Sequence, residues 1–103
     1  MEQNKECRAC CPRKKQRSEE EYKSLIHRLN RIEGQIRGIR GMVESGAYCV
    51  DILTQSAAVN AAVNAFNREL LQNHIRTCVA DDLRAGRDET VEELVATLQK
   101  LMK

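Results

Sequence analysis

The fold is decided by residues 47–85, which read AYCVDILTQSAAVNAAVNAFNRELLQNHIRTCVADDLRA and contain neither glycine nor proline. Alanine, leucine, glutamine and arginine, all good helix formers, make up much of this stretch. A narrow seam of side chains recurs through it at spacings of three and four residues, namely Ile52, Ser56, Val59, Val63, Phe66 and Leu70. The pattern predicts one long amphipathic helix.

Shorter helices are predicted on both sides of it. Ser18 and Glu21 form a capping box, and Gly46 is suited to end a helix. Between them an apolar stripe spans roughly seven turns, consisting of Tyr22, Leu25, Leu29, Ile32, Ile36, Ile39 and Val43. Asp88 or Thr90 can cap a third helix, whose inner face is predicted to hold Val91, Leu94, Val95, Leu98 and Met102. No strand pattern appears, so the predicted fold is all-α with three helices.

The 103 residues suffice for one domain. Residues 1–17 are polar and basic, and are expected to form a mobile tail before a helical domain of residues 18–103. Residues 1–40 carry eleven basic and six acidic side chains, a net of +5, whereas residues 41–103 carry six basic and nine acidic side chains, a net of −3. This asymmetry suggests a local anionic partner such as nucleic acid.

Composition also excludes several classes of protein. Three aromatic residues and no tryptophan argue against a stacking platform for single-stranded nucleic acid. No apolar run is long enough to span a membrane, and no signal region begins the chain, so a cytoplasmic location is expected. In a reducing compartment the five cysteines indicate metal ligands or redox thiols before structural disulfides. No phosphate-binding loop or acid–base set suggests an enzyme.

The length of the central helix bears on assembly. At about 1.5 Å per residue, a helix of residues 47–85 spans nearly 60 Å and overshoots any partner within the chain. Its apolar seam then needs another protomer. A dimer or higher oligomer is therefore expected.

A candidate metal site involves the same helix. His74 and Cys78 are four residues apart and share one face, but Cys49 lies 25 residues upstream, about 37 Å along a continuous helix. An antiparallel pair of such helices places Cys49 of one protomer beside His74 and Cys78 of the other. Two thiolates and one imidazole favour Cu(I), since Zn(II) prefers a fourth ligand. The alternative is a core histidine with two inert buried cysteines.

Four stretches in this order resemble the CsoR family of bacterial repressors, which includes copper-, nickel- and formaldehyde-sensing members. They are RLNRIEGQIRGI (28–39), AYCVDIL (47–53), NHIRTCV (73–79) and VEEL (91–94). The resemblance covers about residues 18–102. It implies a three-helix protomer, an antiparallel dimer and a dimer-of-dimers tetramer. It also implies an apo form that represses by binding operator DNA, with Cu(I) releasing it to derepress copper-resistance genes.

The resemblance also assigns residues. The family's copper ligands map onto Cys49, His74 and Cys78, whereas nickel-type members replace the last cysteine and persulfide-type members lack the histidine. Tyr48 and Glu93 match residues that connect the site to the last helix, although a solvated face explains Glu93 equally well. Three tail thiols lie outside the resemblance, Cys7, Cys10 and Cys11, and are either accessory metal or redox thiols or an unselected tail.

Double-stranded operator DNA is the expected partner, held by the first helix. Gly34, Gly38 and Gly41 leave one face of it bare. The basic side chains expected to contact phosphates are Arg28, Arg31, Arg37 and Arg40, together with Arg17, and Gln35 is a candidate for base contact. A close helix–helix crossing with ordinary solvated arginines explains the same pattern.

Two other functions remain open from the sequence. One is a persulfide- or electrophile-sensing repressor in which Cys49 and Cys78 react covalently. The other is a cytosolic copper buffer or chaperone, for which the basic helix is incidental. DNA binding by the apo protein separates the buffer from both repressors.

Overall fold

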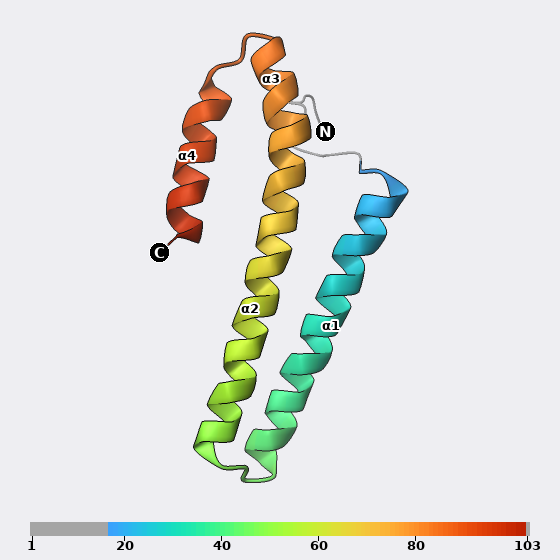
Figure 1. The fold of residues 1–103 in the computed structure, drawn as a ribbon, viewed down its shortest axis with the longest axis vertical. Coiled ribbons are helices and arrows are strands. Elements are labelled where there is room, and N and C mark those ends of the chain that lie inside the picture. The colour runs from blue at the N-terminus through green and yellow to red at the C-terminus, as the bar shows by residue number, and fades with distance from the viewer. Residues whose placement is uncertain (1–16, 103) are drawn as a thin grey trace. The chain divides into compact units, whose positions relative to one another are not determined.

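The computed structural model describes residues 17–102 as a series of helices (Figure 1). The α-helices are α1 (Glu19–Glu44), α2 (Cys49–His74), α3 (Ala80–Arg84) and α4 (Glu89–Leu101), and the π-helical segment η1 (Ile75–Val79) joins α2 to α3. No strand occurs in this part of the chain, which confirms the all-α prediction. The described residues form two compact units, residues 17–71 and the chain from Gln72 onward, and each is described by itself.

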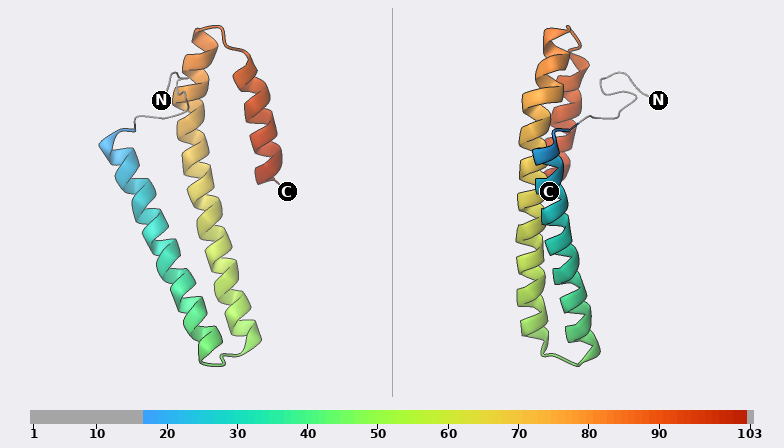
Figure 2. Two further views of the ribbon diagram at one scale, coloured as in Figure 1. Left: turned by 180° about the vertical axis from the view of Figure 1, so that it is seen from behind. Right: turned by 90° about the vertical axis from the view of Figure 1, so that its right-hand side faces the viewer.

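Both ends of α1 follow the sequence signals. The Ser18 side chain accepts a hydrogen bond from the backbone N–H of Glu21 at 3.1 Å, as the capping box predicts. At the other end Gly46 has φ +75°, a left-handed conformation in which a side chain is strained. The Ala47 N–H then donates to the Met42 carbonyl at 2.9 Å. This turn sends the chain back along α1, and both views show α1 and α2 antiparallel in the first unit (Figure 2).

The apolar stripe of α1 separates into two rows of seven-residue spacing. Leu25 and Ile32 are buried and form the row that faces α2. The other row is 42 to 61% exposed and consists of Tyr22, Leu29, Ile36 and Val43. Seven-residue spacing is the repeat by which helices pack against each other in pairs. In the part of the chain that the structure describes, only one of the two rows is therefore buried.

The long central helix differs from the prediction of one α-helix over residues 47–85. Helix begins at Cys49, ends at Arg84, and passes through η1, where the Ala80 N–H reaches back five residues to the Ile75 carbonyl. The Thr77 hydroxyl donates to the Asn73 carbonyl at 2.7 Å. A threonine that bonds the carbonyl four residues back competes with the backbone N–H for it and is associated with bent helices. Thr54 and Thr97 make the same bond within regular α-helix, so this hydrogen bond does not by itself account for the π-helical turn.

The second unit ends in α4. Gly86 has φ +82°, and the Arg87 N–H donates to the Asp82 carbonyl at 2.8 Å, which closes α3. Asp88 holds the cap position of α4 without a side-chain cap bond, whereas Thr90 is buried inside the first turn. The predicted inner face is only partly covered, because Leu94 and Leu98 are half-buried but Val91, Val95 and Met102 are exposed. Among the described residues no helix is long and apolar enough to cross a membrane.

Candidate functional site

The three predicted ligands lie at the two ends of the central helix. Cys49 is the first residue of α2 and is exposed, and His74 is its last residue. Cys78 follows within η1 and is half-buried. Within residues 17–102 no group of three or more His, Cys, Asp or Glu side chains is placed to hold a metal ion. The described part of one protomer therefore offers His74 and Cys78, four residues apart, but no completed site.

The chemistry of this donor set fits a soft, low-coordinate metal ion. Both cysteines are free thiols. The Thr77 hydroxyl lies 3.7 Å from the Cys78 sulfur, so the thiol next to His74 has a polar neighbour on its own turn. Two thiolates and an imidazole satisfy Cu(I), which accepts few ligands and prefers sulfur. The residues present fit such an ion provided that the third donor comes from a second copy.

The two residues assigned beside the site are placed differently. Tyr48 precedes α2 and is exposed. Glu93 is exposed on α4, in the same compact unit as His74 and Cys78, and its backbone carbonyl accepts a hydrogen bond from the Thr97 hydroxyl at 2.9 Å. The proposed connection of Tyr48 and Glu93 to the ligands stays a prediction.

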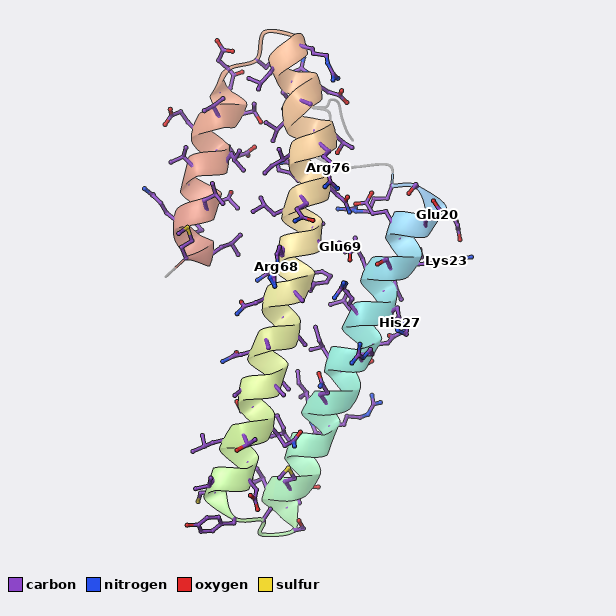
Figure 3. All side chains as sticks on the ribbon, in the orientation of Figure 1. Glu20, Lys23, His27, Arg68, Glu69 and Arg76 are labelled. Carbon is purple, nitrogen blue, oxygen red and sulfur yellow. The ribbon has the colours of Figure 1, made fainter. Side chains whose placement is uncertain are left out.

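The first basic residue predicted to contact DNA from α1, Arg28, forms an ion pair with a residue of α2. Its Nε donates to Glu69 Oε1 at 2.7 Å across the hairpin, and the two side chains are 41% and 23% exposed. Glu69 lies on the side of α2 that faces α1, whereas Arg68 lies on the opposite side (Figure 3). Hydrogen bonds from the Ser24 hydroxyl and then from Arg28 hold the pKa of Glu69 below its ordinary value of 4.5, against the opposing effect of burial. The carboxylate is therefore ionised at neutral pH.

Arg28 also borders a pocket between the two helices. The pocket has a volume of about 280 Å³ and is lined by Arg28, Arg31, Gln35, Ala61, Ala62 and Ala65. Three alanines with short side chains line it from α2, and two arginines line it from α1. The Gln35 side-chain oxygen is buried and has no hydrogen-bond partner among the described residues. The pocket thus combines positive charge with an unused acceptor.

This pocket is not lined by Arg17, which precedes α1, or by the remaining arginines of α1. Arg37 lies nine residues from Arg28, about two and a half helical turns, so it points to the opposite side of α1. It pairs with Glu33 at 3.8 Å, and both side chains are exposed. Arg17 pairs with Glu21 at 3.4 Å, and Arg40 is exposed near the end of the helix. The structure therefore brings together Arg28 and Arg31 and separates them from Arg37.

The bare glycine face is open within the protomer. A side-chain carbon added at Gly38 or Gly41 would meet no described atom within 4 Å. At Gly34 the nearest atom would be Arg37 Nη2 at 3.8 Å. Among residues 17–102 no close helix crossing therefore explains these glycines, and this part of the chain leaves their surface open.

Two structural features were not predicted from the sequence, and one prediction concerns residues that the structure does not describe. Glu69 was not singled out, because its role depends on a contact with a residue 41 positions away. The π-helical turn of η1 was missed as well, and Thr77 is no signal for it, because Thr54 and Thr97 make the same bond within regular α-helix. The tail thiols lie outside the described residues, namely Cys7, Cys10 and Cys11.

Comparison with known proteins gives a consistent result. A family model described as "Metal-sensitive transcriptional repressor" matches residues 21–100. The copper-sensing transcriptional repressor CsoR of Bacillus subtilis is 44% identical over 88 residues, which cover 84% of this chain and 87% of that protein. The copper-sensing repressor RicR of Mycobacterium tuberculosis is 38% identical over 79 residues, covering 74% and 82%.

Solved structures agree in fold. A crystal structure of the copper-sensing repressor CsoR with Cu(I) from Geobacillus thermodenitrificans superposes with a TM-score of 0.82 at 40% identity, covering 87% of this chain and 95% of the other. The nickel-responsive regulator InrS superposes with a TM-score of 0.67 at 32% identity, covering 85% and 97%. The family match and the identity with the Bacillus subtilis repressor show that the chain belongs to the metal-sensitive transcriptional repressors.

Proposed function

We propose that the protein is a Cu(I)-responsive transcriptional repressor whose apo form binds operator DNA and whose metal-bound form releases it. The observation that carries this proposal is the position of His74 and Cys78 one turn apart on a helix that begins at Cys49. Relatives that are 44% and 38% identical are copper-sensing repressors. Cu(I) binding would derepress copper-resistance genes. A bacterial repressor of this kind acts in the cytoplasm, where its operator lies.

The metal site is proposed to form between two protomers. Cys49 and His74 are separated by 25 residues of continuous α-helix, about 37 Å of helical rise, so one chain does not supply all three donors. Antiparallel pairing would bring Cys49 of one copy beside His74 and Cys78 of the other, giving two sites per dimer. The exposed row of α1 supplies an apolar surface for such pairing, since about 25 cal/mol is gained for each Å² of apolar surface removed from water. Two dimers would then form the tetramer.

Copper is favoured over nickel by the donors. A nickel-responsive regulator shares the fold, so the fold by itself does not select the metal. Thiolates select Cu(I), whereas imidazole and oxygen donors suit Ni(II) better. When bound, Cu(I) would supply a soft Lewis-acid centre that fixes two thiolates and one imidazole. Tyr48 and Glu93 are proposed to orient these ligands through hydrogen bonds and to report occupancy to α4.

DNA is proposed to bind along α1. Arg28 and Arg31 give two guanidinium groups at one pocket, and the open glycine face allows close approach of a DNA backbone. Phosphate contacts and DNA shape would carry recognition, because no helix-turn-helix or zinc-finger pattern is present. Arg17, Arg37 and Arg40 would add weaker contacts around this centre. The basic tail of residues 1–17 would reinforce binding, and its thiols are proposed as accessory metal ligands.

The test is anaerobic fluorescence anisotropy of the full-length protein on a labelled DNA fragment from upstream of its own gene, titrated with Cu(I). We expect apo protein to bind and to be released near one Cu(I) per protomer. Binding that ignores Cu(I) but is lost with polysulfide would identify a sulfur sensor instead. No feature of the described residues favours a sulfur sensor or a copper buffer over the Cu(I)-responsive repressor.

A further inference from the structure

The ion pair between Arg28 and Glu69 joins the proposed DNA-binding helix to the helix that carries the metal ligands. Its Nε–Oε1 distance of 2.7 Å is that of a strong charge-assisted hydrogen bond. Both side chains are partly exposed, so solvent screens the pair and its contribution to stability is small. Because this ion pair has good geometry but contributes little to stability, we looked for a role in binding.

The geometry of the guanidinium indicates such a role. Arginine has five N–H donors in one plane, and Glu69 engages only the one on Nε. Among the described residues the four donors on the two terminal nitrogens of Arg28 have no hydrogen-bond acceptor, so they remain for other acceptors. Because the group is planar, fixing Nε from one side also fixes the plane in which those four donors lie. Arg28 lines the pocket together with Arg31 and Gln35, so this plane is fixed at the pocket.

We propose that Glu69 is a positioning residue for DNA: it holds Arg28 through Nε so that the terminal nitrogens present a preformed fork to one backbone phosphate at the pocket. The short side chains of Ala61, Ala62 and Ala65 leave the space that a phosphate group needs. Arg31 adds the second positive charge. This inference rests on the proposed function, since it assigns a role to a neighbour of its DNA-binding residues.

The lowered pKa of Glu69 agrees with this role. A carboxylate that accepts hydrogen bonds from the Ser24 hydroxyl as well as from Arg28 stays ionised through the physiological pH range, so it remains an acceptor for Arg28. Arginine in solution loses rotamer freedom when it binds a phosphate, and a side chain that is already held loses less. Positioning therefore raises affinity even though the carboxylate repels the phosphate.

Because of that repulsion, the direction in which Glu69→Ala changes DNA affinity distinguishes the two possible roles of Glu69. If Glu69 only neutralises Arg28, Glu69→Ala removes a negative charge from the DNA-binding surface and tightens binding. If Glu69 positions Arg28, the same substitution weakens binding. We expect Glu69→Ala to weaken DNA binding about tenfold, the size of one charge-assisted contact. The dependence of log affinity on log salt should also fall by about one unit.

The experiment measures DNA affinity and its salt dependence by anisotropy for the full-length protein. The variants are Glu69→Ala, Glu69→Gln, Arg28→Ala and the double variant of Arg28→Ala with Glu69→Ala. Glu69→Gln keeps an oxygen acceptor and should recover most of the affinity. Glu33→Ala is the matched control, because it removes the same charge from α1 at an exposed pair with Arg37 on the other side of the helix. It should leave affinity within about twofold of the wild type.

The double variant separates positioning from a general structural effect. We expect Glu69→Ala to have no further effect once Arg28 is absent, with helical content by circular dichroism unchanged in all variants. Tighter binding by Glu69→Ala, or an equal loss with and without Arg28, would overturn the inference. Arg28→Ala with wild-type DNA affinity would instead overturn the Arg28 contact in the proposed function. Inorganic phosphate at millimolar concentration should compete with DNA equally well for Glu33→Ala and for the wild type, since the control retains the pocket.

Discussion

The hairpin of residues 17–71 and the segment from Gln72 onward differ in whether one chain supplies all the residues of the proposed site. In the hairpin, Glu69 of α2 holds Arg28 of α1 and the pocket beside them is formed by one chain. The later segment holds His74 and Cys78 one turn apart, but the described residues complete no metal-binding group of three. The proposed DNA-contacting surface thus lies within one protomer, whereas the proposed metal site draws its third ligand from a second protomer. Metal response and oligomeric state should be linked more tightly than DNA contact and oligomeric state.

The largest effect is expected from breaking the exposed row of α1. Ile36 is 53% exposed within the protomer, so Ile36→Asp should be tolerated by the single chain but should place a charge in the proposed interface. We expect loss of the dimer by sedimentation velocity, together with loss of tight Cu(I) binding. A dimer that persists with full Cu(I) binding would show that this row is not the interface.

Removing one ligand should abolish the response without abolishing DNA binding. His74→Ala leaves the Arg28 pocket intact, so apo protein should bind DNA within about twofold of the wild type. Cu(I) should no longer release it. The chain has one other histidine, and His27→Ala is therefore a matched control that should respond normally. Figure 3 places His27 on the outer side of α1. Normal release of the His74→Ala protein would remove His74 from the sensor.

Substitutions at the proposed DNA-binding residues should weaken DNA binding and leave Cu(I) binding unchanged. Arg28→Ala and Arg31→Ala should each weaken DNA binding about tenfold and reduce the salt slope by about one unit, because each removes a phosphate contact. Cu(I) affinity, measured by competition with a chromogenic chelator, should not change. Arg37→Ala should have a smaller effect on DNA, since Arg37 lies on the other side of α1 and pairs with Glu33. Equal losses from all three would indicate a DNA surface that surrounds the helix.

The smallest effect concerns acid stability. The folded state lowers the pKa of Glu69, so its ionised form contributes stability above about pH 4.5, and this contribution is lost as the pH falls through the lowered value. Wild type should exceed Glu69→Gln by at most about 1 kcal/mol at pH 7, because the pair is partly exposed. Chemical unfolding at pH 7 and pH 3 measures the difference, which should shrink at the lower pH. A difference that grows on acidification would contradict the assigned direction.

The sequence predicted what depends on local signals. Ser18 with Glu21 and the turn at Gly46 located both ends of α1, because capping involves residues within one turn. The position of His74 and Cys78 on one helix followed from their spacing. The hydrogen bond between Arg28 and Glu69 could not be predicted in this way, since it depends on how two helices align in the hairpin. The π-helical turn of η1 was not predicted either, because the periodicity of apolar residues does not distinguish hydrogen bonds to the fifth residue back from those to the fourth.

The most direct test of a sensor completed by two chains is complementation between two defective variants. Cys49→Ala retains His74 and Cys78, and Cys78→Ala retains Cys49, so an antiparallel heterodimer has one intact site and one empty of both thiols. Each variant alone should bind Cu(I) weakly and stay on DNA when it is added. After subunit exchange, we predict that the mixture regains one tight Cu(I) per heterodimer by anaerobic competition titration. A mixture no better than either variant alone would contradict a site shared between protomers.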